Sequence, residues 1–371
     1  MTPVFLGLPP GTPRLLIPQA SAKIQSQAFL LYSPSSRQGQ FFCSFGKILA
    51  QTGLLKPLAR FFPFSRKNHS LPAAIEPLLS ECFIEALITI WAKHLNEQEL
   101  IPAISLGTPN AFQKLTVLLF GRKGIPCALV KVGQTVCAKG LIRHEAETLG
   151  GIAKMGLEQA AVPRMLGQGE YNGAGWLMQS VLMGGSPSPL SMGTGHWAFL
   201  KELAQKTRIE APLETVPFFP ALQKALEPEE VIAAEWRQEE RFIRELRDRV
   251  RKDISNIANT SWPLTAAHGD FSPWNIRVIN GRLAIYDWEY FLNLAPAGWD
   301  VMRFIFVVEH LLRRQTIEQI VGSLEAGKYD SDFSRWQEAC GITIPDRIWL
   351  GRLFFLELAC DASRRNICGQ G

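Results

Sequence analysis

Asp270, Asn275 and Asp287 are the residues of this chain whose types and spacing best suit chemistry. Asp270 lies five residues before Asn275, and Asp287 follows farther along the same segment. An amide oxygen beside a carboxylate suits a Mg²⁺ ion that carries nucleotide phosphates, because this ion takes a few protein oxygens and keeps its other positions for water and phosphate. Asp270 can then accept the proton of an attacking hydroxyl group. This order of residues is typical of phosphoryl transfer.

The segment between Asn275 and Asp287 has the pattern of a β-hairpin. Two short apolar stretches flank the pair Asn280-Gly281, which strongly favours a two-residue turn. A hairpin folds the chain back, so we expect Asn275 and Asp287 to converge on one point. The alternative is a polar loop followed by a hairpin with no ligand.

The run His-Gly-Asp-Phe-Ser-Pro-Trp-Asn at 268–275 resembles the catalytic loop of the aminoglycoside phosphotransferase and choline kinase superfamily. Members of that superfamily carry His-Gly-Asp where protein kinases carry His-Arg-Asp. Two further segments, Asp-Trp-Glu at 287–289 and Ala-Pro-Ala-Gly-Trp-Asp at 295–300, also resemble motifs of this superfamily. The resemblance extends more loosely over residues 100–371 and says little about the substrate.

The resemblance implies a role for each of these residues. Asp270 would be the catalytic base, Asn275 and Asp287 would hold Mg²⁺, and His268 and Asp300 would support the catalytic loop. The co-substrate would be ATP or GTP, and the acceptor would be a hydroxyl group of a small molecule. A sugar, an amino alcohol and a glycan precursor all remain open as acceptors.

The resemblance also implies an α+β, protein-kinase-like fold with two lobes: a small five-stranded antiparallel sheet lobe and a larger helical lobe. We divide the chain into an N-terminal extension at 1–96, an N-lobe at 97–183 that binds the nucleotide, and a C-lobe at 184–371 with the catalytic loop. Only Gly107 stands in the first N-lobe turn, where protein kinases have a glycine-rich loop. A catalytically weak or inactive nucleotide-binding protein of the same fold is therefore the alternative function.

The resemblance also implies an ion pair between a lysine and a glutamate of the N-lobe. Five N-lobe strands are predicted, at 101–106, 114–120, 127–132, 162–166 and 175–181. The third strand carries Lys131, which in the superfamily would contact the nucleotide phosphates. In the helix predicted over 138–152, the apolar stripe places Glu145 at the border of the buried face and Glu147 on the outside. Glu145 is therefore the expected partner of Lys131.

The last predicted N-lobe strand leads into the expected hinge between the lobes. By their position, Gln179 and Val181 would bind the base of the nucleotide there. Elsewhere, helices are predicted at 45–55, 82–95, 232–257, 301–312 and 348–360, and further strands at 14–18 and 28–32.

Composition narrows the class of protein. The net charge is +5, but no long Lys/Arg block occurs, so nucleic acid is not an expected partner. Seven cysteines, odd in number and without Cys-x-x-Cys spacing, favour reduced thiols in a cytoplasmic setting.

No membrane-crossing segment is expected, and prolines interrupt the apolar start of the chain where a signal peptide would need a continuous apolar stretch. Basic residues interleave with phenylalanines over 56–67, a combination that suits an anionic membrane surface. Ordinary packing with a basic rim is the preferred interpretation of that segment.

Overall fold

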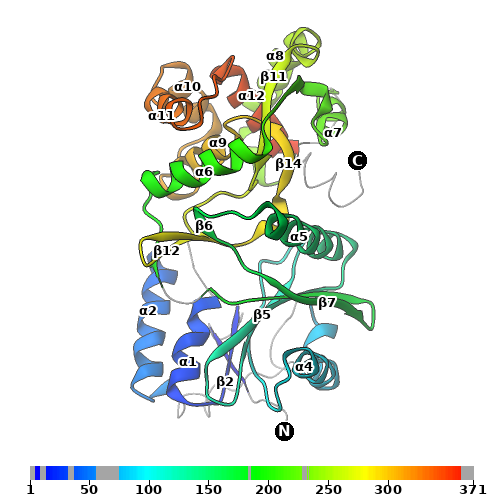
Figure 1. Ribbon diagram of the computed structural model, residues 1–371, viewed down its shortest axis with the longest axis vertical. Coiled ribbons are helices and arrows are strands. Elements are labelled where there is room, and N and C mark those ends of the chain that lie inside the picture. The colour runs from blue at the N-terminus through cyan, green and yellow to red at the C-terminus, as the bar shows by residue number, and fades with distance from the viewer. Residues whose placement is uncertain are drawn as a thin grey trace. The chain divides into compact units, whose positions relative to one another are not determined.

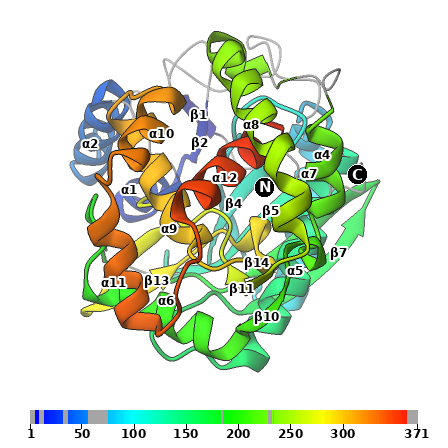
Figure 2. The same ribbon diagram turned by 90° about the horizontal axis from the view of Figure 1, so that it is seen from above.

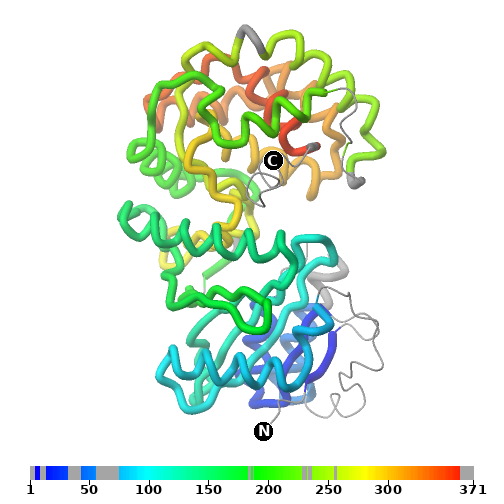
Figure 3. The backbone as a smooth tube through the Cα atoms, turned by 90° about the vertical axis from the view of Figure 1, so that its right-hand side faces the viewer, coloured from blue at the N-terminus to red at the C-terminus, as the bar shows by residue number. Residues whose placement is uncertain are grey.

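The structure is a computed structural model that describes residues 5–8, 14–31, 37–55, 75–182, 185–227, 232 and 234–360. The chain forms two compact units, one made of residues 1–150 and 163–182 and the other of residues 151–162 and 183–371. The chain can be followed by colour in Figure 3, where the blue N-terminal elements and the cyan helix belong to the same unit.

A seven-stranded antiparallel sheet forms the centre of the first unit, in the order β1-β2-β3-β4-β5-β8-β7 (Figure 1). Its strands are β1 (Phe5–Leu8), β2 (Leu15–Pro18), β3 (Ile101–Ser105), β4 (Leu115–Phe120), β5 (Pro126–Gly133), β7 (Met165–Tyr171) and β8 (Ala174–Gln179). The five predicted N-lobe strands correspond to β3, β4, β5, β7 and β8, but β7 begins three residues later than predicted and continues to Tyr171. The two strands from the N-terminal segment extend the sheet beyond the predicted five.

Strand β2 joins the sheet because both of its faces are covered by apolar side chains. Successive residues of a strand point to opposite faces, and here Leu16 enters the hydrophobic cluster on one face while Leu15 and Ile17 enter the cluster on the other. Leu15 pairs with Ser105 of β3, so β2 also satisfies the backbone groups along that edge. The short run Leu-Leu-Ile is apolar throughout for this reason.

Helices cover both faces of this sheet. They are α1 (Ala22–Ala28), α2 (Arg37–Gln51), α4 (Glu81–Leu95) and α5 (Val136–Met155). Helices α1 and α2 lie side by side (Figure 1) and belong to one hydrophobic cluster, whereas α4 belongs to the other. The strand predicted at 28–32 is wrong: α1 ends at Ala28 and a 3₁₀ turn, Phe29–Leu31, follows, because Phe29 packs into the cluster beside α1.

The second unit contains two small sheets. One has the order β6-β13-β12-β9, and the other β10-β11-β14. The strands are β6 (Ala160–Ala161), β9 (Ser186–Pro187), β10 (Ile209–Pro212), β11 (Ser261–Ala267), β12 (Ile276–Ile279), β13 (Arg282–Ile285) and β14 (Leu292–Pro296). The predicted hairpin is present as β12 and β13, with Asn280 and Gly281 at its turn in positive-φ conformations.

Helices make up most of the second unit. They are α6 (Thr194–Thr207), α7 (Phe219–Ala225), α8 (Glu240–Ala258), α9 (Trp299–Phe306), α10 (Ile317–Glu325), α11 (Asp330–Cys340) and α12 (Arg347–Cys360). Helices α9 and α12 pack against each other (Figure 2). The helix predicted from residue 232 begins as an α-helix only at Glu240, after a 3₁₀ turn, and the one predicted to end at Leu312 continues beyond Phe306 as a π-helix.

Of the helices among the described residues, none combines the length and the apolar character needed to cross a membrane. The basic and aromatic stretch at 56–67 lies outside the described residues.

Candidate active site

Lys131 and Glu145 form a buried ion pair in the first unit. Lys131 lies on the interior strand β5 and Glu145 on α5, and Lys131 Nζ lies 2.6 Å from Glu145 Oε2. The two side chains are 7% and 0% exposed, whereas Glu147 lies on the exposed side of the helix. The contact is the one that the phase of the helix predicts, since residues two positions apart point to nearly opposite sides.

The N-terminus of α5 is fixed by Thr135, whose hydroxyl accepts a hydrogen bond from the Ala138 N–H at 3.1 Å. This bond sets where the helix begins, and so sets which of its later residues face the sheet. Gly133 allows close approach here, because a Cβ atom at that position would lie 2.6 Å from Ala138 Cβ.

Gln179 and Val181 lie at the end of β8 and just after it. Gln179 is 1% exposed, and its Oε1 atom has no hydrogen-bond partner within the part of the chain that the structure describes. In the register of the sheet Gln179 is opposite Leu129, two residues from Lys131. Val181 packs against the apolar cluster that contains α1. Their contact with a nucleotide base stays a prediction.

A buried aspartate holds the backbone of the loop 268–270 in the second unit. Asp300 Oδ2 accepts a hydrogen bond from the His268 N–H at 2.7 Å, and Oδ1 accepts one from the Gly269 N–H at 3.0 Å. Burial raises the pKa of the Asp300 carboxyl to about 7, while the two N–H donors and Arg303 lower it and Asp270 raises it. Asp300 therefore contacts the loop that the resemblance expects it to support.

Glycine is required at position 269 for two reasons. Its φ angle is +78°, in the region that side chains disfavour, and a Cβ atom there would lie 1.9 Å from the Tyr290 carbonyl oxygen. The loop therefore passes against the backbone of the 3₁₀ turn Trp288–Tyr290 with no room for a side chain.

His268 has the contacts of a structural residue. Its Nδ1 accepts a hydrogen bond from the Asp270 N–H at 3.2 Å, and its Nε2 lies 2.9 Å from the Tyr286 carbonyl oxygen. A ring that accepts at Nδ1 and faces a carbonyl at Nε2 carries its proton at Nε2. The imidazole also packs on the Trp288 indole, with ring centroids 4.5 Å apart. It thus links the loop to the hairpin.

Asp270 and Asn275 are in direct contact. The Asn275 Nδ2 group donates to Asp270 Oδ2 at 2.8 Å and to the Asp270 carbonyl oxygen at 3.0 Å. Both bonds use the amide nitrogen, which leaves the amide oxygen of Asn275 as the atom that can bind a cation. The contact therefore directs the amide nitrogen of Asn275 to Asp270 and its amide oxygen away from these two bonds.

Asp287 is brought next to Asn275 by the hairpin. The Tyr286 N–H donates to the Asn275 carbonyl oxygen at 2.9 Å, and Ile276 pairs with Ile285 in the ladder. Asp287 has a left-handed backbone, with φ 63°, which is uncommon for a residue other than glycine and is found often at functional sites. A carboxylate and an amide oxygen on adjacent backbone segments fit Mg²⁺, which prefers hard oxygen ligands.

Arg303 contacts Asp270 and was not among the residues predicted from the sequence. Its Nε and Nη2 atoms donate to Asp270 Oδ1 at 3.0 and 2.7 Å, and the two side chains are 13% and 12% exposed. The available signal was its position three residues after Asp300, which places both on one face of α9.

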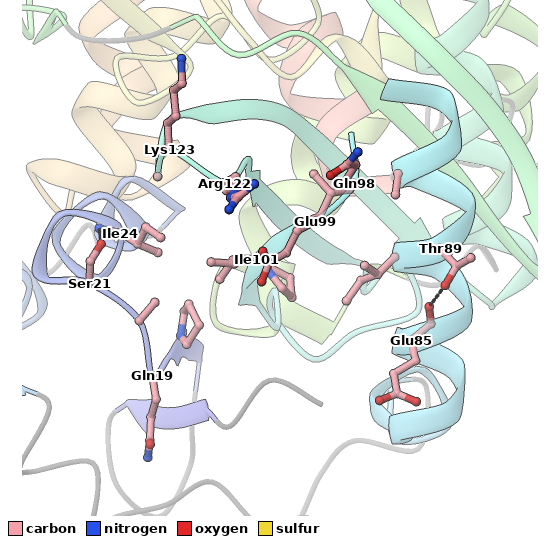
Figure 4. Close-up of a pocket in the computed structure, with 17 residues that line it drawn as sticks. Gln19, Ser21, Ile24, Glu85, Thr89, Gln98, Glu99, Ile101, Arg122 and Lys123 are labelled. Carbon is pink, nitrogen blue, oxygen red and sulfur yellow. Dashed lines mark hydrogen bonds between the residues drawn. The ribbon is translucent and has the colours of Figure 1, made fainter. Parts of the chain in front are cut away.

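A cavity of about 1030 Å³ lies elsewhere in the first unit (Figure 4). It runs between α1 and α4, and its charged lining residues are Glu85, Glu99, Arg122 and Lys123, all exposed. None of the predicted site residues lines it, and its charges balance. The cavity is therefore lined by a different set of residues from those described above.

A comparison with protein-family models places the chain in a family. The model of the phosphotransferase enzyme family matches residues 121–338, which include Lys131, Asp270, Asn275, Asp287 and Arg303. No curated protein matches the chain.

Several solved structures are similar to the chain. A putative fructosamine-3-kinase from Haemophilus somnus 129PT is 13% identical, with 76% of this chain and 90% of that one covered and a TM-score of 0.42. A spectinomycin phosphotransferase in complex with ADP and spectinomycin is 12% identical, with 77% and 89% covered and a TM-score of 0.47. A glucosamine kinase in complex with glucosamine, ADP and inorganic phosphate is 15% identical, with 77% and 81% covered and a TM-score of 0.42.

The match of the family model over more than half of the chain shows that this protein belongs to the phosphotransferase enzyme family.

Proposed function

We propose that the protein is a small-molecule kinase that transfers the γ-phosphoryl group of ATP or GTP to a substrate hydroxyl group in the presence of Mg²⁺. The observation that carries the proposal is the contact between Asp270 and Asn275. It directs the Asn275 amide nitrogen to the aspartate and leaves the amide oxygen for a metal ion. Family membership supports phosphoryl transfer as the reaction class.

Each unit would contribute a separate part of the chemistry. In the first unit, Lys131, held by Glu145, would neutralise phosphate charge, and Gln179 and Val181 would contact the base. In the second unit, Asn275 and Asp287 would hold Mg²⁺, which screens phosphate charge when bound. Asp270 would orient the acceptor hydroxyl and accept its proton, while His268 and Asp300 would keep the loop in place.

The acceptor would be a sugar, an amino alcohol or a glycan precursor. The cysteine pattern supports a cytoplasmic setting for the reaction. A weak or inactive nucleotide-binding protein is the rival, but a protein that only binds nucleotide has no need of the base Asp270.

Asp270→Asn tests this function most directly. Nucleotide affinity, measured by calorimetry with and without Mg²⁺, should stay near that of the wild type. Phosphate transfer to the acceptor found in a screen of sugars and amino alcohols should fall by about 10²–10⁴-fold, the usual range for a positioned general base. A wild-type protein that binds Mg²⁺-nucleotide but transfers phosphate to no acceptor would favour the rival. An Asp270→Asn variant with wild-type turnover would exclude the assigned base.

A further inference from the structure

The first turns of α9 hold the loop 268–270 at two successive points. Asp300 accepts the N–H groups of His268 and Gly269, as described above. Arg303, one helical turn later, reaches the side chain of the next loop residue, Asp270. Residues three apart lie on one face of a helix, so a single rigid element fixes both the backbone of the loop and the carboxylate that it carries.

The contacts of Asp270 leave its two carboxylate oxygens in different states. A carboxylate has about four acceptor positions, two on each oxygen. Arg303 Nε and Nη2 both donate to Oδ1, and Asn275 Nδ2 donates to Oδ2. The bonds from the described residues thus fill Oδ1 and leave one acceptor position on Oδ2. With Arg303 bound to Oδ1 and Asn275 bound to Oδ2, the carboxylate is held at both oxygens. A lysine ammonium, a point charge on a flexible stem, would hold Oδ1 less firmly than the two donors of the planar guanidinium.

The guanidinium of Arg303 is itself held in place. Its Cζ atom lies 5.8 Å from the centroid of the Phe306 ring, on the same helix. Its side chain is only 13% exposed, so solvent screens its contact with Asp270 weakly. The orientation of the Asp270 carboxylate therefore follows from the position of α9.

We propose that Arg303 is a positioning residue for the phosphoryl transfer, one that makes Oδ2 of Asp270 the atom that receives the acceptor proton. This inference rests on the proposed function. In the step, the acceptor oxygen forms a bond to the γ-phosphorus while the bond from that phosphorus to the bridging oxygen breaks. The electron pair of the broken bond leaves with the nucleoside diphosphate, and the hydroxyl proton moves to Oδ2. Arg303 touches none of the reacting atoms and acts only through Asp270.

Substitutions of Arg303 test this role with two reactions. One is phosphate transfer to the acceptor found by the screen, and the other is ATP hydrolysis, in which water serves as the acceptor. Arg303→Gln should lower kcat in both by about 10²-fold, the order expected for a misplaced catalytic group, while KM for ATP stays the same. Arg303→Lys should retain part of the activity, because one ammonium can reach Oδ1 but cannot fix the plane of the carboxylate.

Chemical rescue separates positioning from a purely structural role. In Arg303→Ala, millimolar guanidinium should restore kcat by at least tenfold, and it should not raise the activity of Asp270→Asn. The matched control is Arg313→Ala. Arg313 follows the helical segment after α9, and its Nη1 lies 2.6 Å from Oε1 of the buried Glu309, so the variant also removes an arginine from an ion pair. That control should keep the kcat of the wild type and should not respond to guanidinium.

The outcomes can be told apart. If Arg303→Gln keeps or exceeds the wild-type kcat, the contact with Asp270 is dispensable or inhibitory, and the positioning role is wrong. If kcat falls only together with nucleotide affinity and thermal stability, and neither lysine nor guanidinium restores it, Arg303 is merely structural and the proposal also fails. If the wild type itself neither hydrolyses ATP nor transfers phosphate, it is the proposed function that fails.

Discussion

Each unit of the molecule contains a pair of opposite charges that is largely shielded from solvent, and the two pairs are built differently. Lys131 contacts one oxygen of Glu145 through a single nitrogen. Asp270 is held by a planar guanidinium at one oxygen and by an amide at the other. A lysine ammonium is a point charge on a flexible stem, whereas an arginine fork imposes an orientation. In the first pair the lysine ammonium can therefore adjust its position to a bound group, whereas in the second pair the orientation of the Asp270 carboxylate is fixed.

Asp287→Ala should have the largest effect and tests the second unit. It removes the charged ligand that we assign to Mg²⁺, so Mg²⁺-dependent nucleotide binding should be lost. Turnover should fall by about 10³-fold or more, since a metal ion supplies several kcal/mol of charge stabilisation. Calorimetry with and without Mg²⁺ measures the binding. Asp248→Ala, at a side chain that is 60% exposed, is the control that should change neither quantity. A folded Asp287→Ala variant with normal turnover would exclude Asp287 as the ligand.

Glu145→Ala tests the first unit in the same way, with Glu147→Ala as the matched control on the same helix. Removing one member of a buried ion pair is strongly destabilising, so the free energy of unfolding should fall by about 3–5 kcal/mol. The exposed Glu147 should matter by no more than about 0.5 kcal/mol. The milder Glu145→Gln should weaken nucleotide binding more than Glu147→Gln does. Equal effects at the two positions would show that the ion pair with Lys131 contributes neither to stability nor to nucleotide binding.

Gly269→Ala probes the fixed geometry without changing a charge. Gly281 has the same φ of +78°, but a Cβ atom added there would meet nothing within 4 Å. Gly281→Ala therefore measures only the cost of placing a side chain on a backbone with positive φ. That penalty should be about 1–3 kcal/mol. Gly269→Ala should cost more, because its Cβ also meets the Tyr290 carbonyl oxygen. Chemical denaturation of both variants measures the difference, and equal losses would mean that the loop can move away from Tyr290.

The pH dependence of stability should show the smallest effect. Burial raises the pKa of Asp300 to about 7, so the folded protein binds a proton there that the unfolded chain has already released. The stabilising contribution of that proton is therefore lost as pH rises through 7. Stability should fall by about 1 kcal/mol between pH 6 and pH 8.

His196 also contributes to the pH dependence of stability, so its contribution must be separated from that of Asp300. Burial lowers its pKa to about 4, so its contribution has the opposite sign and is complete above the unfolded pKa. The difference between the wild type and Asp300→Asn, from unfolding curves at each pH, isolates the Asp300 contribution. If the two proteins have the same slope between pH 6 and 8, Asp300 does not titrate in that range.

The two charged pairs also differ in how far the sequence could predict them. Fourteen residues separate Lys131 from Glu145, and the phase of one helix chose Glu145 over Glu147. Arg303 lies 33 residues from Asp270, beyond the hairpin and a further strand, so the contact depends on how α9 packs. The helix and strand patterns predicted the elements that carry both pairs. They predicted the strand at 14–18 but could not show that Leu15 and Leu16 would pair with β3, because that pairing spans about ninety residues.

Strand β2 has a practical consequence for anyone who wants to produce the catalytic part alone. The family model begins at residue 121, and the predicted N-lobe begins at residue 97, so either limit suggests a shortened protein. A protein that starts at residue 97 would lack β2 at the edge of β3, and one that starts at residue 121 would lack β3 and β4 as well. Both would lose Trp91 and Leu87 from the core beneath the sheet. Their bare strand edge and exposed apolar surface favour aggregation. Expression should therefore include β2 and α4 together with the catalytic part.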